Sequence, residues 1–324
     1  MDLRALTQHR IVRMLRATFD SWMEDNALRL SAALAYYSIF SIAPLLVIAI
    51  SVAGLVLGEE AVRGQLEPQL TGYLGAPAAQ GVQALVKSAS KPSEGWLGTL
   101  VGFGTLLIGA SGVFGQLKDA LNTIWEVKPR GGGGVWGFIR ERLLSFGMVL
   151  VIGFLLLTSL VLTTTLAALS GYVERLIGIP PVVGGMMTFA VSLSVVTLLF
   201  AFIFKVLPDA RIEWRNVWTG AAFTALFFEI GKWGLGLYLG RESTASGFGA
   251  ASSVVILLLW VYYASCILLF GAEFTQVYAR ETGHDIQPTA NAVRVTAGER
   301  AQQGLVPAGS VQSTVRQSRP GASG

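Results

Sequence analysis

The feature that most constrains this chain is the length of its stretches without a charged residue. A helix that crosses about 30 Å of hydrocarbon at about 1.5 Å per residue needs roughly 20 apolar residues. Only 14% of the residues are charged and 52% are hydrophobic, a balance that favours a membrane protein over soluble domains. Five charge-free stretches are long enough to span, between Arg29 and Glu59, Glu94 and Lys118, Arg142 and Glu174, Arg175 and Lys205, and Glu242 and Glu273.

A sixth stretch is similarly apolar but carries Glu229 and Lys232 inside it. With this stretch included, the sequence predicts an all-α, polytopic membrane protein with six transmembrane helices. The expected helices cover Leu30 to Leu57, Trp96 to Gln116, Leu143 to Ser170, Pro181 to Phe204, Trp214 to Leu239, and Gly249 to Tyr278.

The distribution of Lys and Arg predicts the orientation. An even number of spans places both termini on one side, and the loops richest in basic residues face the cytoplasm. The N-terminal segment, the second and fourth loops and the tail hold most of the basic residues. The loops of the other side hold five, namely Arg63, Lys87, Lys91, Arg175 and Arg241. We therefore expect a multi-pass protein of the bacterial inner membrane with both termini in the cytoplasm.

Three regions follow from this topology. We expect a cytoplasmic N-terminal segment at 1–29, a transmembrane domain at 30–279, and a disordered cytoplasmic tail at 280–324, because the tail is polar and has no apolar period. An outer loop at 58–95 has leucines and valines at helical spacing, such as Val62, Leu66 and Leu70. This pattern fits short amphipathic helices that lie on the membrane, and equally helices that cover the protein's own outer face.

Four segments together resemble the YihY/BrkB family of bacterial inner-membrane proteins, whose members have carried the labels ribonuclease BN and virulence factor. The segments are Asn26 to Leu46 (NALRLSAALAYYSIFSIAPLL), Leu117 to Val127 (LKDALNTIWEV), Phe204 to Pro208 (FKVLP), and Ala250 to Tyr278 with its LLLWVYYA and GAEF elements. The resemblance implies a six-helix inner-membrane protein. It implies no settled function, because the family's labels disagree with one another.

The ribonuclease label conflicts with the residues. A metal-dependent nuclease needs clustered His, Asp or Glu side chains to hold ions and activate water. The chain has only His9 and His284, both outside the expected helices, and no clustered carboxylates in its sequence. We therefore expect no enzyme activity, no catalytic or metal site, no cofactor and no nucleic-acid partner.

Pro44 marks one candidate site. It lies well inside the first expected helix, where its ring removes a backbone hydrogen bond and leaves the carbonyl of Phe40 open. Tyr37, Ser38 and Ser41 lie on the adjoining turns. Broken helices near the midplane form substrate sites in many transporters, so these residues are candidate substrate ligands. The alternative is a structural kink whose carbonyl is satisfied by a neighbouring serine.

Glu229 and Lys232 form the second candidate site. They are three residues apart, so they lie on one helix face, and both fall inside an expected span. An isolated charge at the bilayer centre costs about 2.5 to 3.5 kcal/mol on insertion scales, which predicts an ion pair. The alternative is a neutral Glu229 and a Lys232 that anchors the outer end of the helix.

Other polar residues have simpler interpretations. Lys205 and Glu273 are expected at helix boundaries, and Asp25 and Asn122 as helix caps. GxxxG pairs such as Gly236 and Gly240 predict close helix packing, within one chain or with a second copy.

The sequence therefore favours a transporter of an envelope-related or lipid-like substrate, with membrane lipids as its partners. The alternative is a scaffold that recruits other envelope proteins without transporting anything.

Overall fold

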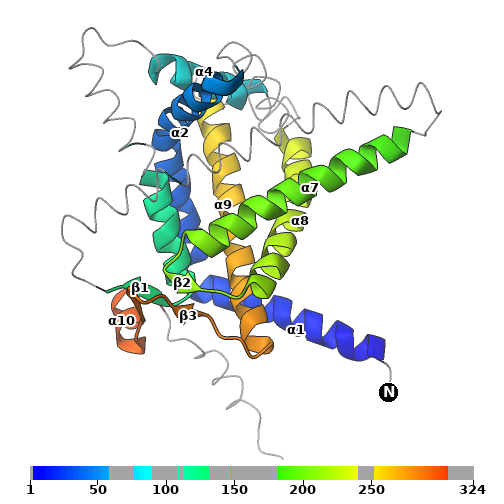
Figure 1. The fold of residues 1–324 in the computed structure, drawn as a ribbon, viewed down its shortest axis with the longest axis vertical. Coiled ribbons are helices and arrows are strands. Elements are labelled where there is room, and N and C mark those ends of the chain that lie inside the picture. Colours follow the sequence, from blue (N-terminus) through cyan, green and yellow to red (C-terminus); the bar gives the residue numbers. More distant parts are fainter. Residues whose placement is uncertain are drawn as a thin grey trace, which may run out of the picture.

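The computed structural model describes residues 3–57, 76–89, 112–130, 181–239 and 252–305, together with Gly109 and Gly147. These residues are mostly helical. Figure 1 shows three helices, α2, α8 and α9, running along the bundle, with α7 inclined across it, α1 across one end and α4 across the other. We call these two ends the α1 end and the α4 end.

The N-terminal region is itself helical. Helix α1 (Leu3–Glu24) is followed after two residues by α2 (Ala27–Leu57). Asn26 makes the turn with φ 51°, a left-handed conformation that asparagine adopts more readily than most residues. The turn lets α1 lie across the bundle while α2 runs along it, as Figure 1 shows.

Three long helices form the centre of the bundle. Helices α7 (Pro181–Val206), α8 (Trp214–Leu239) and α9 (Ser252–Glu281) agree closely with three of the expected ranges. Helix α8 packs on both α7 and α9. Gly220 of α8 faces Thr275 of α9 so closely that a Cβ on the glycine would lie 1.8 Å from the threonine Oγ1. Small residues thus allow these two helices to approach closely, as in membrane helix pairs.

Two helices of the described residues are long and apolar enough to cross a membrane, at Gly185–Val206 and Val254–Glu281. The expected total of six transmembrane helices therefore stays a prediction. Most of the expected helix at 96–116 and nearly all of that at 143–170 lie outside the described residues, although 112–124 is helical.

Helix α4 (Ala76–Ala89) covers the end of the bundle opposite α1. It packs on α9 and α2 and buries Val82 and Val86 with Ile256 and Leu257 of α9. Of the two interpretations of the 58–95 loop, these contacts fit a helix that covers the protein's own surface. Residues 58–75 and 90–95 of that loop lie outside the described residues.

The described part of the tail, 280–305, is folded, which differs from the disorder expected for these residues. Strand β4 (Ala292–Arg294) pairs with β1 (Val127–Pro129), and β3 (Gln287–Pro288) pairs with β2 (Ala210–Arg211). Helix α10 (Ala297–Gln302) follows with a capping box. The tail needs no apolar period because loops between the long helices supply its backbone partners. These short strands also qualify the all-α prediction.

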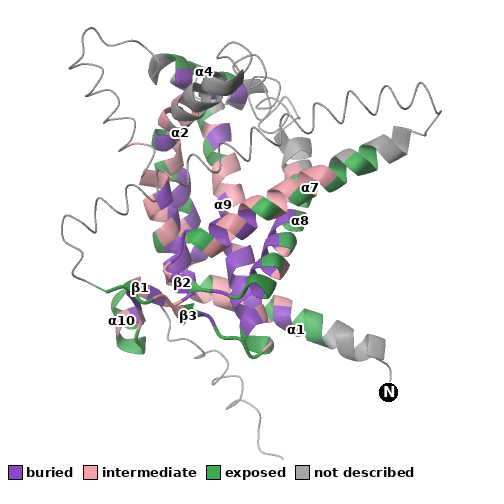
Figure 2. Cartoon of the chain, viewed as in Figure 1, coloured by how far each residue is buried: buried purple, intermediate pink, exposed green. Residues whose placement is uncertain are grey.

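The main hydrophobic core lies toward the α1 end, where Figure 2 shows most of the buried residues. Leu121, Phe204 and Leu269, from three different helical segments, are fully buried there. The indole of Trp125 donates a hydrogen bond to the carbonyl of Ala272 at 3.2 Å. This core holds the helix ends in the positions that the charged residues below require.

Candidate functional site

The predicted ion pair between Glu229 and Lys232 is present. Lys232 Nζ lies 2.6 Å from Glu229 Oε2, and the Glu229 side chain is 6% exposed. Ser192 of α7 donates a hydrogen bond to the other carboxylate oxygen at 2.9 Å. Both oxygens of Glu229 are therefore satisfied, one from α8 and one from α7. We call Glu229 and Lys232 the α8 pair.

A third helix packs on α8 beside the α8 pair, at a different face of the helix. Gly231 lies between the two charged residues, and a Cβ there would lie 2.0 Å from the hydroxyl oxygen of Tyr263 in α9. The tyrosine thus occupies the space that a larger residue at 231 would fill. The α8 pair is held by local helix geometry and by Ser192, while Tyr263 fixes the packing of α8 on α9 at the neighbouring Gly231.

The residues around Pro44 form a packing contact with the segment at 109–124. Helix α2 is continuous across Pro44, so of the kink or break that the sequence predicts, the structure shows no break. Ser41, which is buried, donates a hydrogen bond to the carbonyl of Gly109 at 2.5 Å. A Cβ on Gly109 would lie 3.0 Å from Cγ of Pro44. The proline therefore fits against a glycine of a neighbouring segment, which favours the structural interpretation.

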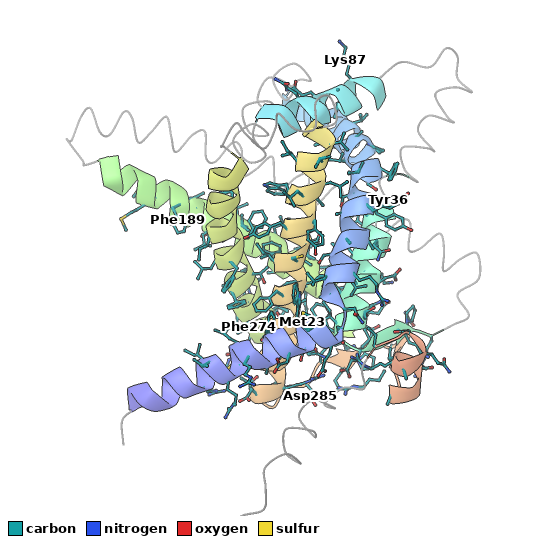
Figure 3. All side chains as sticks on the ribbon, turned by 180° about the vertical axis from the view of Figure 1, so that it is seen from behind. Met23, Tyr36, Lys87, Phe189, Phe274 and Asp285 are labelled. Atoms are coloured by element: carbon teal, nitrogen blue, oxygen red, sulfur yellow. The ribbon has the colours of Figure 1, made fainter. Side chains whose placement is uncertain are left out.

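Tyr37 and Ser38 do not join the α8 pair. Tyr37 is 44% exposed and lies beside Gly112, on the same contact as Ser41, and Ser38 is half-buried. Helix α9 packs on α2 at one side and on α8 at the other, as Figures 1 and 3 also show. The six candidate residues thus fall into two groups with α9 between them.

A second group of charges, three of them almost fully buried, lies at the α1 end. Asp25 and Arg300 are 275 residues apart in sequence, and their side chains meet at 2.5 Å with 5% and 4% exposure. Glu126 lies 3.0 Å from Arg280 and 3.8 Å from Arg300. Glu273, which is fully buried, interacts with Asp25. We call Asp25, Glu126, Glu273, Arg280 and Arg300 the end cluster.

Burial dominates the electrostatics of the end cluster. It raises the pKa of Asp25 above its ordinary value, and the neighbouring Arg300 opposes this shift by favouring the carboxylate. Burial, followed by the charge of Asp25, also raises the pKa of Glu24. Glu126 adopts φ 55°, an uncommon left-handed conformation for a residue with a side chain. In this conformation the Glu126 carboxylate lies near both Arg280 and Arg300.

Sequence reasoning assigned Asp25, Glu273 and Asn122 to helix ends and missed their partners. Asn122 bonds Asp209 twice: its amide donates to Oδ2 at 3.1 Å, and its carbonyl oxygen accepts from the Asp209 backbone at 2.8 Å. Lys118 lies 3.0 Å from the same carboxylate. Asp209 follows the FKVLP segment directly, so two segments that carried the family resemblance meet here. No signal in a single sequence pairs residues so far apart.

A cavity of about 220 Å³ adjoins the end cluster. It lies between the 112–124 segment, β1 and α10, and its lining includes Asn122, Lys128 and Arg300. Lys128 forms an ion pair with Glu299 of α10 at its rim. Within the described residues, no three His, Cys, Asp or Glu side chains form a group that could hold a metal ion.

Long apolar helices with buried charges between them define a helical membrane protein. The family model described as virulence factor BrkB matches residues 18–296. Because this match covers most of the chain, the chain belongs to the BrkB family, and the resemblance predicted from the four segments is confirmed.

Curated relatives are named only as membrane proteins. The UPF0761 membrane protein of Verminephrobacter eiseniae (strain EF01-2) is 32% identical over 257 residues, covering 76% of this chain and 57% of that protein. That of Stenotrophomonas maltophilia (strain K279a) is 28% identical over 294 residues, covering 85% and 63%. The chain thus spans less than two thirds of the length of these two relatives. No solved structure matches it.

Proposed function

We propose that this chain is a transporter of an amphiphilic, envelope-related molecule, and that the α8 pair binds the polar headgroup of that molecule. The observation that carries the proposal is the buried pair itself, with Ser192 of a second helix on the same carboxylate. Charged residues inside membrane helices are expensive, and they mark substrate or ion pathways more often than they stabilise a fold. Apolar residues in their place would pack at lower cost.

The chemistry of the pair suits a charged or zwitterionic headgroup. Lys232 can release Glu229 and bind a phosphate or carboxylate of the substrate, while the Glu229 carboxylate accepts from an ammonium or hydroxyl group. Ser192 would keep one oxygen of Glu229 satisfied during this exchange. The pair therefore changes partners without leaving an isolated buried charge.

The surroundings of the pair suit an apolar tail. Phe189 lies one turn from Ser192 on the part of α7 that leads away from the bundle, as Figure 3 shows, and is 50% exposed. Ile230, next to Glu229 in α8, is 60% exposed. These side chains give the acyl part of an amphiphile an apolar surface close to the pair.

Complementation of a deletion strain tests the assignment. We expect Glu229→Gln with Lys232→Met to insert at normal abundance and to leave the accumulated lipid or envelope precursor of the deletion strain unchanged. The matched control, Glu299→Gln with Lys128→Met, makes the same two changes in a pair outside the long helices and should complement fully. If the α8 double variant complements as well as wild type, the α8 pair is not the binding site.

The same strain separates a transporter from a scaffold. A transporter predicts that a defined lipid or precursor accumulates on deletion and disappears on complementation. If untargeted lipid and metabolite analysis finds no such molecule, while other envelope proteins lose abundance, the scaffold function replaces this proposal.

The proposed location is the bacterial inner membrane with both termini in the cytoplasm, and no catalytic step is assigned to any residue. Reporter fusions after Arg130, Arg211 and Arg280 should report the cytoplasm. Fusions after Lys87 and Arg241 should report the other side. A reversed pattern would contradict the orientation inferred from Lys and Arg.

A further inference from the structure

Helix α1 uses only one of its faces to bind the rest of the protein. It crosses the α1 end of the bundle and its N-terminus points away from it, as Figure 1 shows. Met14 and Thr18 are buried, and Trp22 meets Phe270 of α9 edge-on with ring centroids 6.1 Å apart. Residues 10–13, 16, 19 and 23 of α1 remain exposed in the described structure.

A second face of α1 is apolar and exposed. Val12, Phe19 and Met23 are 64%, 53% and 49% exposed. At about 100° per residue they fall within an arc of roughly 40°, beside the face that packs on α9. Figure 3 labels Met23 near the end of α1 that joins the bundle.

A third face of α1 is basic. Arg13 and Arg16 have 65% and 81% of their side chains exposed, and Arg10 is exposed as well. Arg13 lies 2.9 Å from Glu281 and Arg16 lies 4.0 Å from Asp20. Exposed ion pairs of this kind are worth little, so both guanidinium groups can exchange their partners for phosphate at small cost.

We propose that α1 lies in the headgroup layer of the membrane, with Val12, Phe19 and Met23 at the acyl boundary and its arginines on the phosphates of anionic phospholipids. The bundle also has apolar surface that suits a lipid environment, since Trp218 and Leu226 of α8 are exposed. Helices with a narrow apolar face and a basic face bind at this depth. Anionic phosphates complement the arginines in charge. The inference does not depend on the transport proposal.

Labels at defined positions test the depth. Cys266 is the only cysteine, so a Cys266→Ser background accepts single spin labels at Val12→Cys, Phe19→Cys, Arg13→Cys or Asp20→Cys in full-length protein. In nanodiscs of phosphatidylcholine and phosphatidylglycerol, labels at 12 and 19 should collide more with oxygen than with a water-soluble nickel reagent. Labels at 13 and 20 should show the reverse. Water-like collision rates at all four positions overturn the proposal, and so does protection of 12 and 19 from both reagents, which would indicate a protein partner or a second copy.

Lipid retention tests the basic face. The full chain is taken from the same nanodiscs, and the phosphatidylglycerol that stays bound is counted by native mass spectrometry. Arg13→Gln with Arg16→Gln should lower the retained anionic lipid by about fivefold per arginine at low salt, with phosphatidylcholine unaffected. The matched control is Arg130→Gln with Arg211→Gln, two exposed arginines outside α1. Equal losses in both double variants overturn the assignment to α1.

Discussion

The α8 pair and the end cluster are both buried charge groups, but their partners lie at very different separations along the chain. In the α8 pair the two charges are three residues apart, and Ser192 of another helix donates a hydrogen bond to the carboxylate of Glu229. In the end cluster, Asp25 meets Arg300 across 275 residues, and a second carboxylate faces two arginines. A local pair can change partners without disturbing the fold, whereas a long-range one holds two ends of the chain together. We therefore assign function to the first and stability to the second.

The largest expected effect is at Arg300. Arg300→Met leaves Asp25 buried without its cationic partner. Removing one member of a buried ion pair lowers the free energy of unfolding by about 3–5 kcal/mol. Thermal unfolding in detergent should show a large fall in the unfolding temperature. Lys128→Met, in a half-exposed pair, is the control and should cost under about 1 kcal/mol. Similar stability of these two variants would contradict a structural role for the end cluster.

Helix packing comes next. Gly220→Ala places a Cβ 1.8 Å from Oγ1 of Thr275 and 2.9 Å from its Cβ, and such overpacking costs about 1–3 kcal/mol. Thermal unfolding in detergent should show a lower unfolding temperature for this variant. Gly234→Ala in the same helix is the control, because no atom lies within 4 Å of the added group. A loss in the control equal to that at 220 would indicate a general intolerance of α8 rather than close packing with α9.

Lys232→Met should have a smaller effect on abundance. It leaves the Glu229 carboxylate with its hydrogen bond from Ser192, at a cost below the roughly 2.5 kcal/mol of an isolated charge at the bilayer centre. Adding Glu229→Gln should restore abundance but not complementation. Additive losses of abundance in the double variant would show that the two residues do not act as a pair.

Ser41→Ala tests the region around Pro44. It removes the hydrogen bond to Gly109, and hydrogen bonds between membrane helices average about 0.6 kcal/mol. Abundance and complementation should fall slightly and in parallel. Normal abundance with lost complementation, in Ser41→Ala and in Tyr37→Phe, would instead restore these residues as substrate ligands.

The smallest effect is expected at Glu299. Lys128 and the backbone of Thr296 lower its pKa from 4.5 to about 2. A lowered carboxyl pKa stabilises the fold above pH 4.5, and this contribution is lost as the pH falls toward 2. Unfolding temperatures of wild type and Lys128→Gln should differ slightly at pH 7 and converge below pH 4.5. A difference that grows as the pH falls would contradict this pairing.

The features that could be predicted from the sequence depend on local contacts, and those that could not depend on contacts between residues far apart in the chain. Long apolar stretches predicted α7, α8 and α9, and a spacing of three predicted the α8 pair, because both depend on neighbouring residues. The partner of Asn122 and the strands that order the tail depend on residues far away in sequence. The contact of Pro44 and Ser41 with Gly109 was missed for a related reason, since Gly109 belongs to another segment of the chain.

The junction of Asp25 and Arg300 has a consequence for how the protein is made. At about 5–20 residues per second, the ribosome takes on the order of 15–60 s to reach the arginine after the aspartate has been synthesised. During that interval the first helices can enter the bilayer, but the acidic turn before α2 has no arginine from α10 to neutralise it. Closure of this end is therefore the last step of assembly, and a nascent chain released early should be recognised as unfinished by quality-control proteases at that turn.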